Sequence, residues 1–512
     1  MPNEYNFSAV IVMGSQNIYV QIVDINNASL IENAHYDIDL GEDVFSDRFI
    51  AGDTVNEIVS SLEVVKNLLL DYQVSDYQFF ATNAFHEARN SEFVRDQLQK
   101  RTNFEINWIS QSQESLYRNL ATNFYLKDFK KIVRDNTLLI DISSGNIELM
   151  GYKNGDFIYS KTLSLGPLRV YETMSDVKPD ISNFNEVLHD YIDSQLLEFV
   201  RLLPNIESTK NVILLGSSVT ILKLLFGTDK DTNKLTMKDF DNLYHKMRRV
   251  NDQELTHRYK IDENDLSQVV PLVTIIHELL DRLSVQKIWL SSLKFIDGLT
   301  CELIEDKQEN NIQQMLNNQT LVSAKNMAKQ YNVEPKHQAM VEKFALKLFD
   351  SLEDIHGLDD RQRLLLQVSS IVDDVGNFVN NYNHYAHSEY VIKNSEILGL
   401  SNIELIMVAM ISRYHSHSAT SSIFKMLDKL SISDRMVVIK LAAILRIADS
   451  LDASRLQKVR TIDINLDDPT KLIIYVTTDD ELTLETLNLN RKGAFFESVF
   501  GIKPILKGEI RQ

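Results

Sequence analysis

The most constraining feature of this chain is a short stretch that changes from apolar to small polar residues and back. It reads L-L-I-D-I-S-S-G-N-I-E-L over residues 138–149. Two apolar runs around a turn of small residues predict a β-hairpin. The hairpin tip would offer backbone N–H groups to an anion, and the neighbouring carboxylates, Asp141 and Glu148, could hold a hydrated cation. The stretch therefore predicts a site for phosphate groups, whose oxygens need donors and charge neutralisation.

A second stretch of the same kind lies near the N-terminus. Residues 8–24 read S-A-V-I-V-M-G-S-Q-N-I-Y-V-Q-I-V-D. When the two stretches are aligned, Gly14 falls on Ser143, Asn17 on Asn146 and Tyr19 on Glu148. This internal repeat predicts two related halves of a bilobal α/β unit, each opened by one hairpin.

The order of the remaining patterns predicts four domains. Strand-like and helix-like segments alternate up to about residue 300, which predicts mixed sheets covered by helices. Ser112 is expected to cap a helix that carries Glu114 in its first turn, and Asp297-Gly298 is expected to form a turn. After a polar linker at 306–318, residues 321–455 are almost wholly helical in pattern, and 461–477 resemble a hairpin. The predicted domains are 1–127, 128–312, 313–458 and 459–512.

Composition limits the partners and the compartment. The 512 residues carry a net charge of −19, which repels polyanions over a Debye length of about 8–10 Å and argues against nucleic-acid binding. A phosphate ligand would need local basic groups. The basic runs at 127–134 and 245–249 are either such a channel or solvated helix faces. The single cysteine, Cys301, excludes an internal disulfide framework, and no signal peptide or apolar run of about 20 residues is present, so we expect a cytoplasmic protein without a membrane segment.

The ordered set of motifs resembles the exopolyphosphatase/guanosine-pentaphosphate phosphohydrolase (Ppx/GppA) family in its long form. Besides the 138–149 hairpin, the matching motifs are I-V-M-G-S-Q-N at 11–17, A-T-N-A-F-H-E-A-R-N at 81–90, I-S-Q-S-Q-E-S at 109–115, S-L-G-P-L-R at 164–169, L-G-S-S-V-T at 215–220 and S-S-L-K-F-I-D-G-L at 291–299. The resemblance implies two ribonuclease-H-like lobes of the actin-like ATPase superfamily around a phosphate cleft. An all-α HD-like domain and a small α+β C-terminal domain would follow, and the protein would form a homodimer.

The family resemblance also implies an activity. Its members release the terminal phosphate of inorganic polyphosphate, or the 5′ phosphate of guanosine pentaphosphate, with Mg²⁺ or Mn²⁺. Glu114 matches the glutamate that activates water, while Asp141 and Glu148 match the acids that hold the metal or the water. Arg169 and Lys294 are either ligand contacts or solvated surface charges. The phosphate-binding tips would consist of Gly14, Ser15, Gln16, Asn17, Ser143, Ser144, Gly145 and Asn146.

Several family positions are replaced in this chain. Val12 stands where the family has an Asp, His86 stands for a phosphate-contacting Arg, Gln113 for the first Glu of a pair, and Ser143 and Ser144 for glycines. Losing one preorganised contact costs about 3–4 kcal/mol of transition-state stabilisation, on the order of 10²–10³ in rate. The leading interpretation is an exopolyphosphatase-type hydrolase attenuated by these changes. The alternative is a non-catalytic relative that binds polyphosphate or a guanosine alarmone.

The helical domain resembles the HD phosphohydrolase fold, which holds one or two metal ions. The matching residues are His337, Asp373, Asp374, His387, His415 and Asp449, with Asp373 where the family has a His. A carboxylate still suits Mg²⁺ or Mn²⁺. These residues are either buried polar groups satisfied between helices or a metal site, and the latter opens a third possibility, metal-dependent phosphohydrolysis by this domain.

Overall fold

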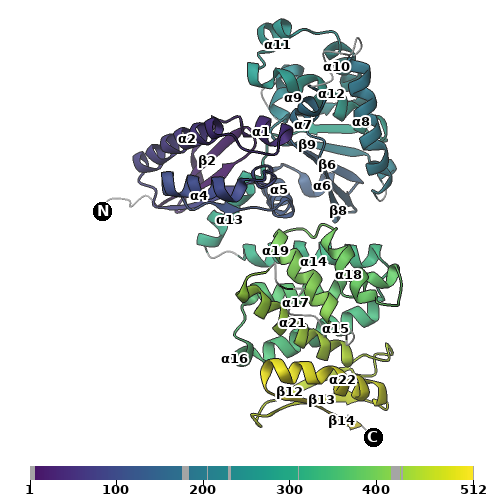
Figure 1. The fold of residues 1–512 in the computed structure, drawn as a ribbon. Coiled ribbons are helices and arrows are strands. Elements are labelled where there is room, and N and C mark those ends of the chain that lie inside the picture. The colour runs from purple at the N-terminus through teal and green to yellow at the C-terminus, as the bar shows by residue number, and fades with distance from the viewer. Residues whose placement is uncertain are drawn as a thin grey trace. The chain divides into compact units, whose positions relative to one another are not determined.

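The computed structural model describes residues 6–175, 184–203, 206–228, 232–308, 311–416, 427 and 430–510. The chain forms two compact units, 1–316 and 317–512, which Figure 1 colours from purple to teal and from green to yellow. The first unit contains two mixed sheets with helices around them, so the predicted α/β class is confirmed for this part. The finer division into four domains stays a prediction.

The first sheet is built around the N-terminal hairpin. Its strand order is β3-β2-β1-β4-β5, in which β1 pairs antiparallel with β2 and parallel with β4. The strands are β1 (Phe7–Met13), β2 (Asn17–Asp24), β3 (Ser29–Asp37), β4 (Asp76–Ala81) and β5 (Asn107–Trp108).

Strand β1 is buried on both faces. Ala9, Ile11 and Met13 belong to a core that includes helices α2 and α4, which lie over this sheet in Figure 1. Val10 and Val12 belong to a second core that includes α13. Burial of alternate side chains on opposite faces explains why β1 reads as a continuous apolar run.

The second sheet repeats the topology of the first. Its order is β10-β11-β9-β6-β7-β8, so β8-β7-β6-β9-β11 correspond to β3-β2-β1-β4-β5 and keep the same strand directions. The internal repeat seen in the sequence is therefore a repeat of fold. The strands are β6 (Thr137–Ile142), β7 (Ile147–Lys153), β8 (Asp156–Leu163), β9 (Asn211–Leu215), β10 (Thr232–Leu235) and β11 (Lys287–Leu290).

Helices cover both sheets of the first unit, and amphipathic patterns account for most of them. They are α1 (Leu40–Ser46), α2 (Gly52–Asp71), α3 (Asn83–His86), α4 (Ser91–Thr102), α5 (Gln111–Tyr125), α6 (Phe129–Ile132), α7 (Pro167–Ser175), α8 (Phe184–Arg201), α9 (Val219–Phe226), α10 (Met237–Met247), α11 (Asp252–Tyr259), α12 (Leu266–Asp281) and α13 (Phe295–Lys307).

The second unit is a helical bundle joined to a three-stranded sheet through one continuous core. The sheet order is β12-β13-β14, with β14 parallel to β13. Its elements are α14 (Ile312–Gln330), most of which lies in this unit, α15 (Pro335–Ser351), α16 (Glu353–His356), α17 (Asp360–Val372), η4 (Val375–Phe378), α18 (His384–Lys393), α19 (Asn402–Tyr414), α21 (Ile432–Ser450), β12 (Thr461–Asn465), β13 (Lys471–Thr478), α22 (Thr483–Phe500) and β14 (Lys503–Ile510). An HD-like fold for this bundle stays a prediction.

Three local predictions are wrong. Ser110, and not Ser112, caps α5, because its side chain and that of Gln113 form a reciprocal capping box. Asp297-Gly298 is no turn but part of the first turn of α13, where Asp297 accepts a hydrogen bond from the backbone N–H of Lys294. The predicted linker at 306–318 overlaps the end of α13 and the start of α14.

Candidate functional site

One cavity of the first unit collects nearly all the residues that the sequence singled out there. All eight predicted tip residues line it, together with Glu114 and Asp141. The remaining lining residues are Val12, Tyr19, Thr82, Asn83, Ala84, Arg118, Gly216, Ser217, Lys294, Phe295 and Ile296. Glu148 is not among the lining residues.

The two hairpin tips have matching turns. Gly14 N–H donates to Asn17 O at 2.9 Å, and Ser143 N–H donates to Asn146 O at 3.0 Å. These are the positions that the sequence alignment equates. The tips also touch each other, because Ser15 Oγ donates to Ser144 Oγ at 3.2 Å.

The carbonyl groups of both tips are held by the elements behind them. Ser15 O accepts from the N–H of Gly41 in α1 at 2.7 Å, and Ser144 O accepts from the N–H of Leu168 in α7 at 3.0 Å. In a trans peptide the following N–H points opposite to the carbonyl. The N–H groups of Gln16 and Gly145 are therefore directed away from α1 and α7, and both residues line the cavity.

Asp141 and Glu148 face each other across β6 and β7. Like charges in that arrangement repel, and the buried guanidinium of Arg118 lies between them. Its Nη2 is 2.6 Å from Asp141 Oδ2, and its Nη1 donates to Glu148 Oε2. Ser160 Oγ donates to the other oxygen of Glu148. Both oxygens of Glu148 are thus engaged by protein groups, so the geometry does not support the metal-holding role predicted for it.

Glu114 lies at the start of α5, one turn before Arg118. Its Oε2 is 4.0 Å from Arg118 Nη2, and its Oε1 accepts a hydrogen bond from the backbone N–H of Asn83 at 3.4 Å. Burial raises the pKa of Glu114 to about 7 and that of Asp141 to about 6. At neutral pH Glu114 is therefore poised to take up or release a proton.

Lys294 brings positive charge to the cavity. Its Nζ lies 3.9 Å from the centre of the Tyr19 ring, a cation–π distance, and burial lowers its pKa. Lys294 is therefore a cavity residue and not a solvated surface charge.

Gly216 permits the close approach of the 215–220 turn to Asp141. Its φ is +96°, and a Cβ on this residue would lie 2.2 Å from Asp141 Oδ1. Only glycine fits at this position without displacing the carboxylate.

Arg169 and His86, which the sequence also singled out, lie outside the lining of the cavity. Arg169 Nε donates to Gly145 O at 2.8 Å, and its Nη2 contacts both oxygens of Glu87. The exposed His86 ring packs against Trp108, with 4.9 Å between ring centres. Among the described residues, none from the basic runs 127–134 and 245–249 lines the cavity.

The sequence analysis missed Arg118, Tyr19 as a cavity residue, and Asn83. A local signal existed for Arg118, because residues four apart share a helix face and Arg118 follows Glu114 at that spacing. Its contact with the β6–β7 hairpin comes from the tertiary fold.

In the second unit five of the six residues predicted to bind metal interact with one another: Asp449 interacts with Asp373, Asp374, His337 and His415, and His337 Nε2 is 4.0 Å from Asp374 Oδ2. His337 Nδ1 is 2.9 Å from Asp452 Oδ2 and its Nε2 is 3.3 Å from Asp449 Oδ1. Burial lowers the pKa of His337, but the two acids outweigh this effect and raise the pKa to about 10. Lys492 pairs with Asp449, and Arg455 pairs with one oxygen of Asp374.

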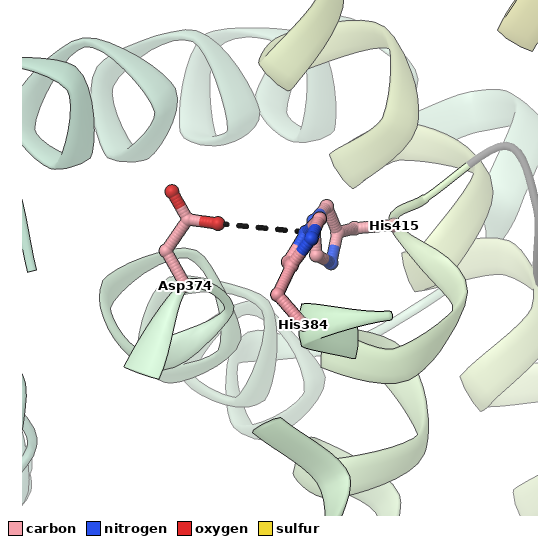
Figure 2. A group of neighbouring side chains, drawn as sticks. All are labelled: Asp374, His384 and His415. Atoms are coloured by element: carbon pink, nitrogen blue, oxygen red, sulfur yellow. Dashed lines mark hydrogen bonds and ion pairs between the residues drawn. The ribbon is translucent and has the colours of Figure 1, made fainter. Parts of the chain in front are cut away.

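A different group of potential ligands does come together: Asp374, His384 and His415, shown in Figure 2. Their ligand atoms all lie within 4.8 Å of one another. His384, and not His387 one turn further along α18, is the member from that helix. Buried Asp373 is next to this group in sequence, and burial together with Asp374 raises its pKa.

Comparison with known proteins identifies the family. The family model described as the Ppx/GppA phosphatase family matches residues 20–332, and the one described as Ppx/GppA phosphatase, domain III, matches residues 321–491. The guanosine-5′-triphosphate,3′-diphosphate pyrophosphatase of Pseudoalteromonas translucida is 21% identical over 458 residues, which cover 86% of this chain and 87% of that protein.

Solved structures with a similar fold carry related names. An exopolyphosphatase from Cytophaga hutchinsonii has a TM-score of 0.50 and 16% identity, covering 59% of this chain and 98% of its own. An exopolyphosphatase-like protein has a TM-score of 0.52, 16% identity and the same coverage. Across the described residues, no helix has the length and apolar character needed to cross a membrane. The matched family model spans more than half of the sequence, and the chain belongs to the Ppx/GppA phosphatase family.

Proposed function

We propose that this protein hydrolyses the terminal phosphoanhydride bond of inorganic polyphosphate and that the cavity of the first unit is its active site. The observation that carries the proposal is that two equivalent hairpin tips and the carboxyl of Glu114 line the same cavity. Phosphoryl transfer depends mainly on positioning and on charge neutralisation, and this cavity offers groups for both.

The tips and Lys294 would bind the phosphate oxygens. The N–H groups of Gln16 and Gly145 are donors that carry no net charge, and Lys294 adds one positive charge. Glu114 would take a proton from the attacking water, since its pKa of about 7 allows the basic form near neutral pH. The water oxygen bonds to the terminal phosphorus as the bridging P–O bond breaks, and orthophosphate leaves with the shortened polymer.

The divalent metal implied by the family resemblance suits Asp141. Within the described chain, Asp141 Oδ1 is buried and has no hydrogen-bond partner, whereas Oδ2 is held by Arg118. Carboxylate oxygens are ligands that Mg²⁺ and Mn²⁺ accept. Asp141 would hold the ion, which would neutralise phosphate charge, and Glu148 would fix Arg118 and so orient Asp141.

The replacement of one acid argues for a reduced rate. Val12 and Tyr19 are paired across β1 and β2 as Asp141 and Glu148 are across β6 and β7. The first hairpin thus offers an apolar side chain where the second offers a carboxylate. We expect turnover below that of a relative with carboxylates on both hairpins. The homodimer, the cytoplasmic location and the HD-like fold of the second unit stay expectations from the resemblance.

The decisive experiment is phosphate release from long-chain polyphosphate in the presence of Mg²⁺, with guanosine pentaphosphate tested in parallel. The wild-type protein should release phosphate, and Glu114→Gln should lower kcat by about 10²–10³-fold. Glu63→Gln is a matched control, because Glu63 is an exposed acid on α2. Equal rates for wild type and Glu114→Gln would contradict catalysis at this cavity. Cleavage of the nucleotide alone would assign the site to that substrate.

A further inference from the structure

We propose that the second unit binds one divalent first-row transition-metal ion between Asp374, His384 and His415. The three side chains converge from different elements: Asp374 follows α17, His384 begins α18 and His415 follows α19. The two imidazole Nε2 atoms are 3.2 Å apart, and Asp374 Oδ1 is 3.7 Å from His384 Nε2.

The tautomers of both rings direct their lone pairs to the same point. His384 Nδ1 is 3.3 Å from Asn381 O, and His415 Nδ1 contacts Ser412 O. A carbonyl oxygen only accepts hydrogen bonds, so each Nδ1 carries the proton and each Nε2 is left as an acceptor. Two lone pairs that face each other at 3.2 Å repel unless a cation lies between them. Backbone carbonyls that fix the far side of ligating imidazoles are a usual feature of metal sites.

The spacing matches one shared ion. Two nitrogens bound to the same ion at about 2.0–2.1 Å are separated by about 2.9–3.4 Å for bond angles between about 90° and 109°. The separation of 3.2 Å between the two Nε2 atoms lies within this interval.

Asp374 is oriented for the same role. Arg455 Nη2 holds its Oδ2 at 2.6 Å, which leaves Oδ1 turned toward His384. Asp449, which is paired with Lys492, also interacts with Asp374 and His415. The His384 side chain is 24% exposed, which gives an ion access from solvent.

The ligand set indicates the class of metal. Two imidazoles and one carboxylate suit Zn²⁺, Co²⁺ or Mn²⁺ better than Mg²⁺ or Ca²⁺, which prefer oxygen ligands. Three protein ligands leave at least one coordination position for water or a ligand. The site is separate from the cavity of the first unit, so its occupancy does not depend on the proposed polyphosphatase activity.

The test is titration of the full-length, chelator-treated protein with Co²⁺, followed by visible absorption. We expect d–d bands that saturate, and loss of at least about 100-fold in affinity at this site in His384→Ala and in His415→Ala. His387→Ala is the matched control on α18 and should bind as wild type. Asp141→Asn should also keep the bands, which separates this site from the one in the first unit.

A second readout covers variants that fold poorly. Zn²⁺ should raise the Tm of the wild-type protein and of His387→Ala, but not that of His384→Ala. Circular dichroism should show that His384→Ala keeps its helical content. The proposal would be overturned if the wild-type protein showed no Co²⁺ bands, or if the bands were unchanged in both His384→Ala and His415→Ala. A proton shared between the two Nε2 atoms would then explain their contact.

Discussion

Ser15 and Ser144 lie 129 residues apart in sequence, yet their hydroxyl groups are hydrogen-bonded at 3.2 Å. Ser144 Oγ in turn donates to Gln16 Oε1 at 2.5 Å. The contact joins the two hairpin tips, so a phosphate bound by one tip is also close to the other.

Variants of Ser144 test whether phosphate is bound by backbone N–H groups or by the side-chain hydroxyl. Ser144→Ala keeps every backbone N–H and should change KM for polyphosphate by less than about threefold. Ser144→Asp places a negative charge beside the phosphate and should raise KM at least about 100-fold, since like charges about 4 Å apart repel by several kcal/mol at a protein surface. Steady-state kinetics at fixed Mg²⁺ measure both. A large effect of the alanine variant would assign phosphate binding to the hydroxyl.

The pH dependence of kcat/KM should report Glu114. The basic form is needed, and burial raises its pKa to about 7, so the rate should increase with pH and be about tenfold lower at pH 6 than at pH 8. The residual rate of Glu114→Gln should not increase with pH in this way, whereas the rate of Glu63→Gln should. If kcat/KM of Glu114→Gln increased with pH as in the wild type, the pH dependence would belong to another group.

Arg118 should matter for stability as well as for activity. Arg118→Met leaves Asp141 and Glu148 facing each other without a counter-charge, and removing one partner from a buried ion pair costs about 3–5 kcal/mol. Urea unfolding should show this loss, and adding Glu148→Gln to Arg118→Met should recover part of it. A loss below about 1 kcal/mol in the single variant would mean that the three groups are not a coupled unit.

Lys294 should act on substrate binding. Lys294→Ala removes the cation beside Tyr19 and should raise KM for polyphosphate about tenfold, with a weaker dependence of KM on salt. Lys287→Ala, at an exposed lysine of β11, is the control and should behave as wild type. An equal change in both variants would indicate a general effect of net charge.

The parts of the site set by local sequence could be predicted. Turn residues and apolar alternation fix the two hairpins, and their alignment anticipates the matching hydrogen bonds of Gly14 and Ser143. The same signals mislead where a turn residue has another use. The dipeptide Gly166-Pro167 is of a kind that often marks turns, but proline is also favoured at the first position of a helix, and α7 begins there. Gly298 reads as a turn, but a Cβ there would lie 1.9 Å from Tyr117 O, so close packing of α13 on α5 requires glycine.

Other features depend on tertiary contacts. Strand β14 contains Pro504 and Gly508, which weaken a strand pattern, but as an edge strand it tolerates proline. His384 and His387 lie one turn apart on α18, and only the packing of α19 determines which of them meets His415. No pattern in the sequence places Arg118 between two strands that follow it.

The two hairpins carry different residue pairs at the same register: Val12 with Tyr19, and Asp141 with Glu148. The two sides of the cavity are therefore chemically different. A polyphosphate chain has two identical ends, so it carries no polarity of its own. One hairpin brings the carboxylate of Asp141 to the cavity and the other brings the apolar Val12 and the ring of Tyr19. Under the proposed function, the phosphate that reaches Asp141 would become the leaving orthophosphate. The two halves share one topology, so the difference at this one pair of residues would separate a reactive side of the cavity from a passive one.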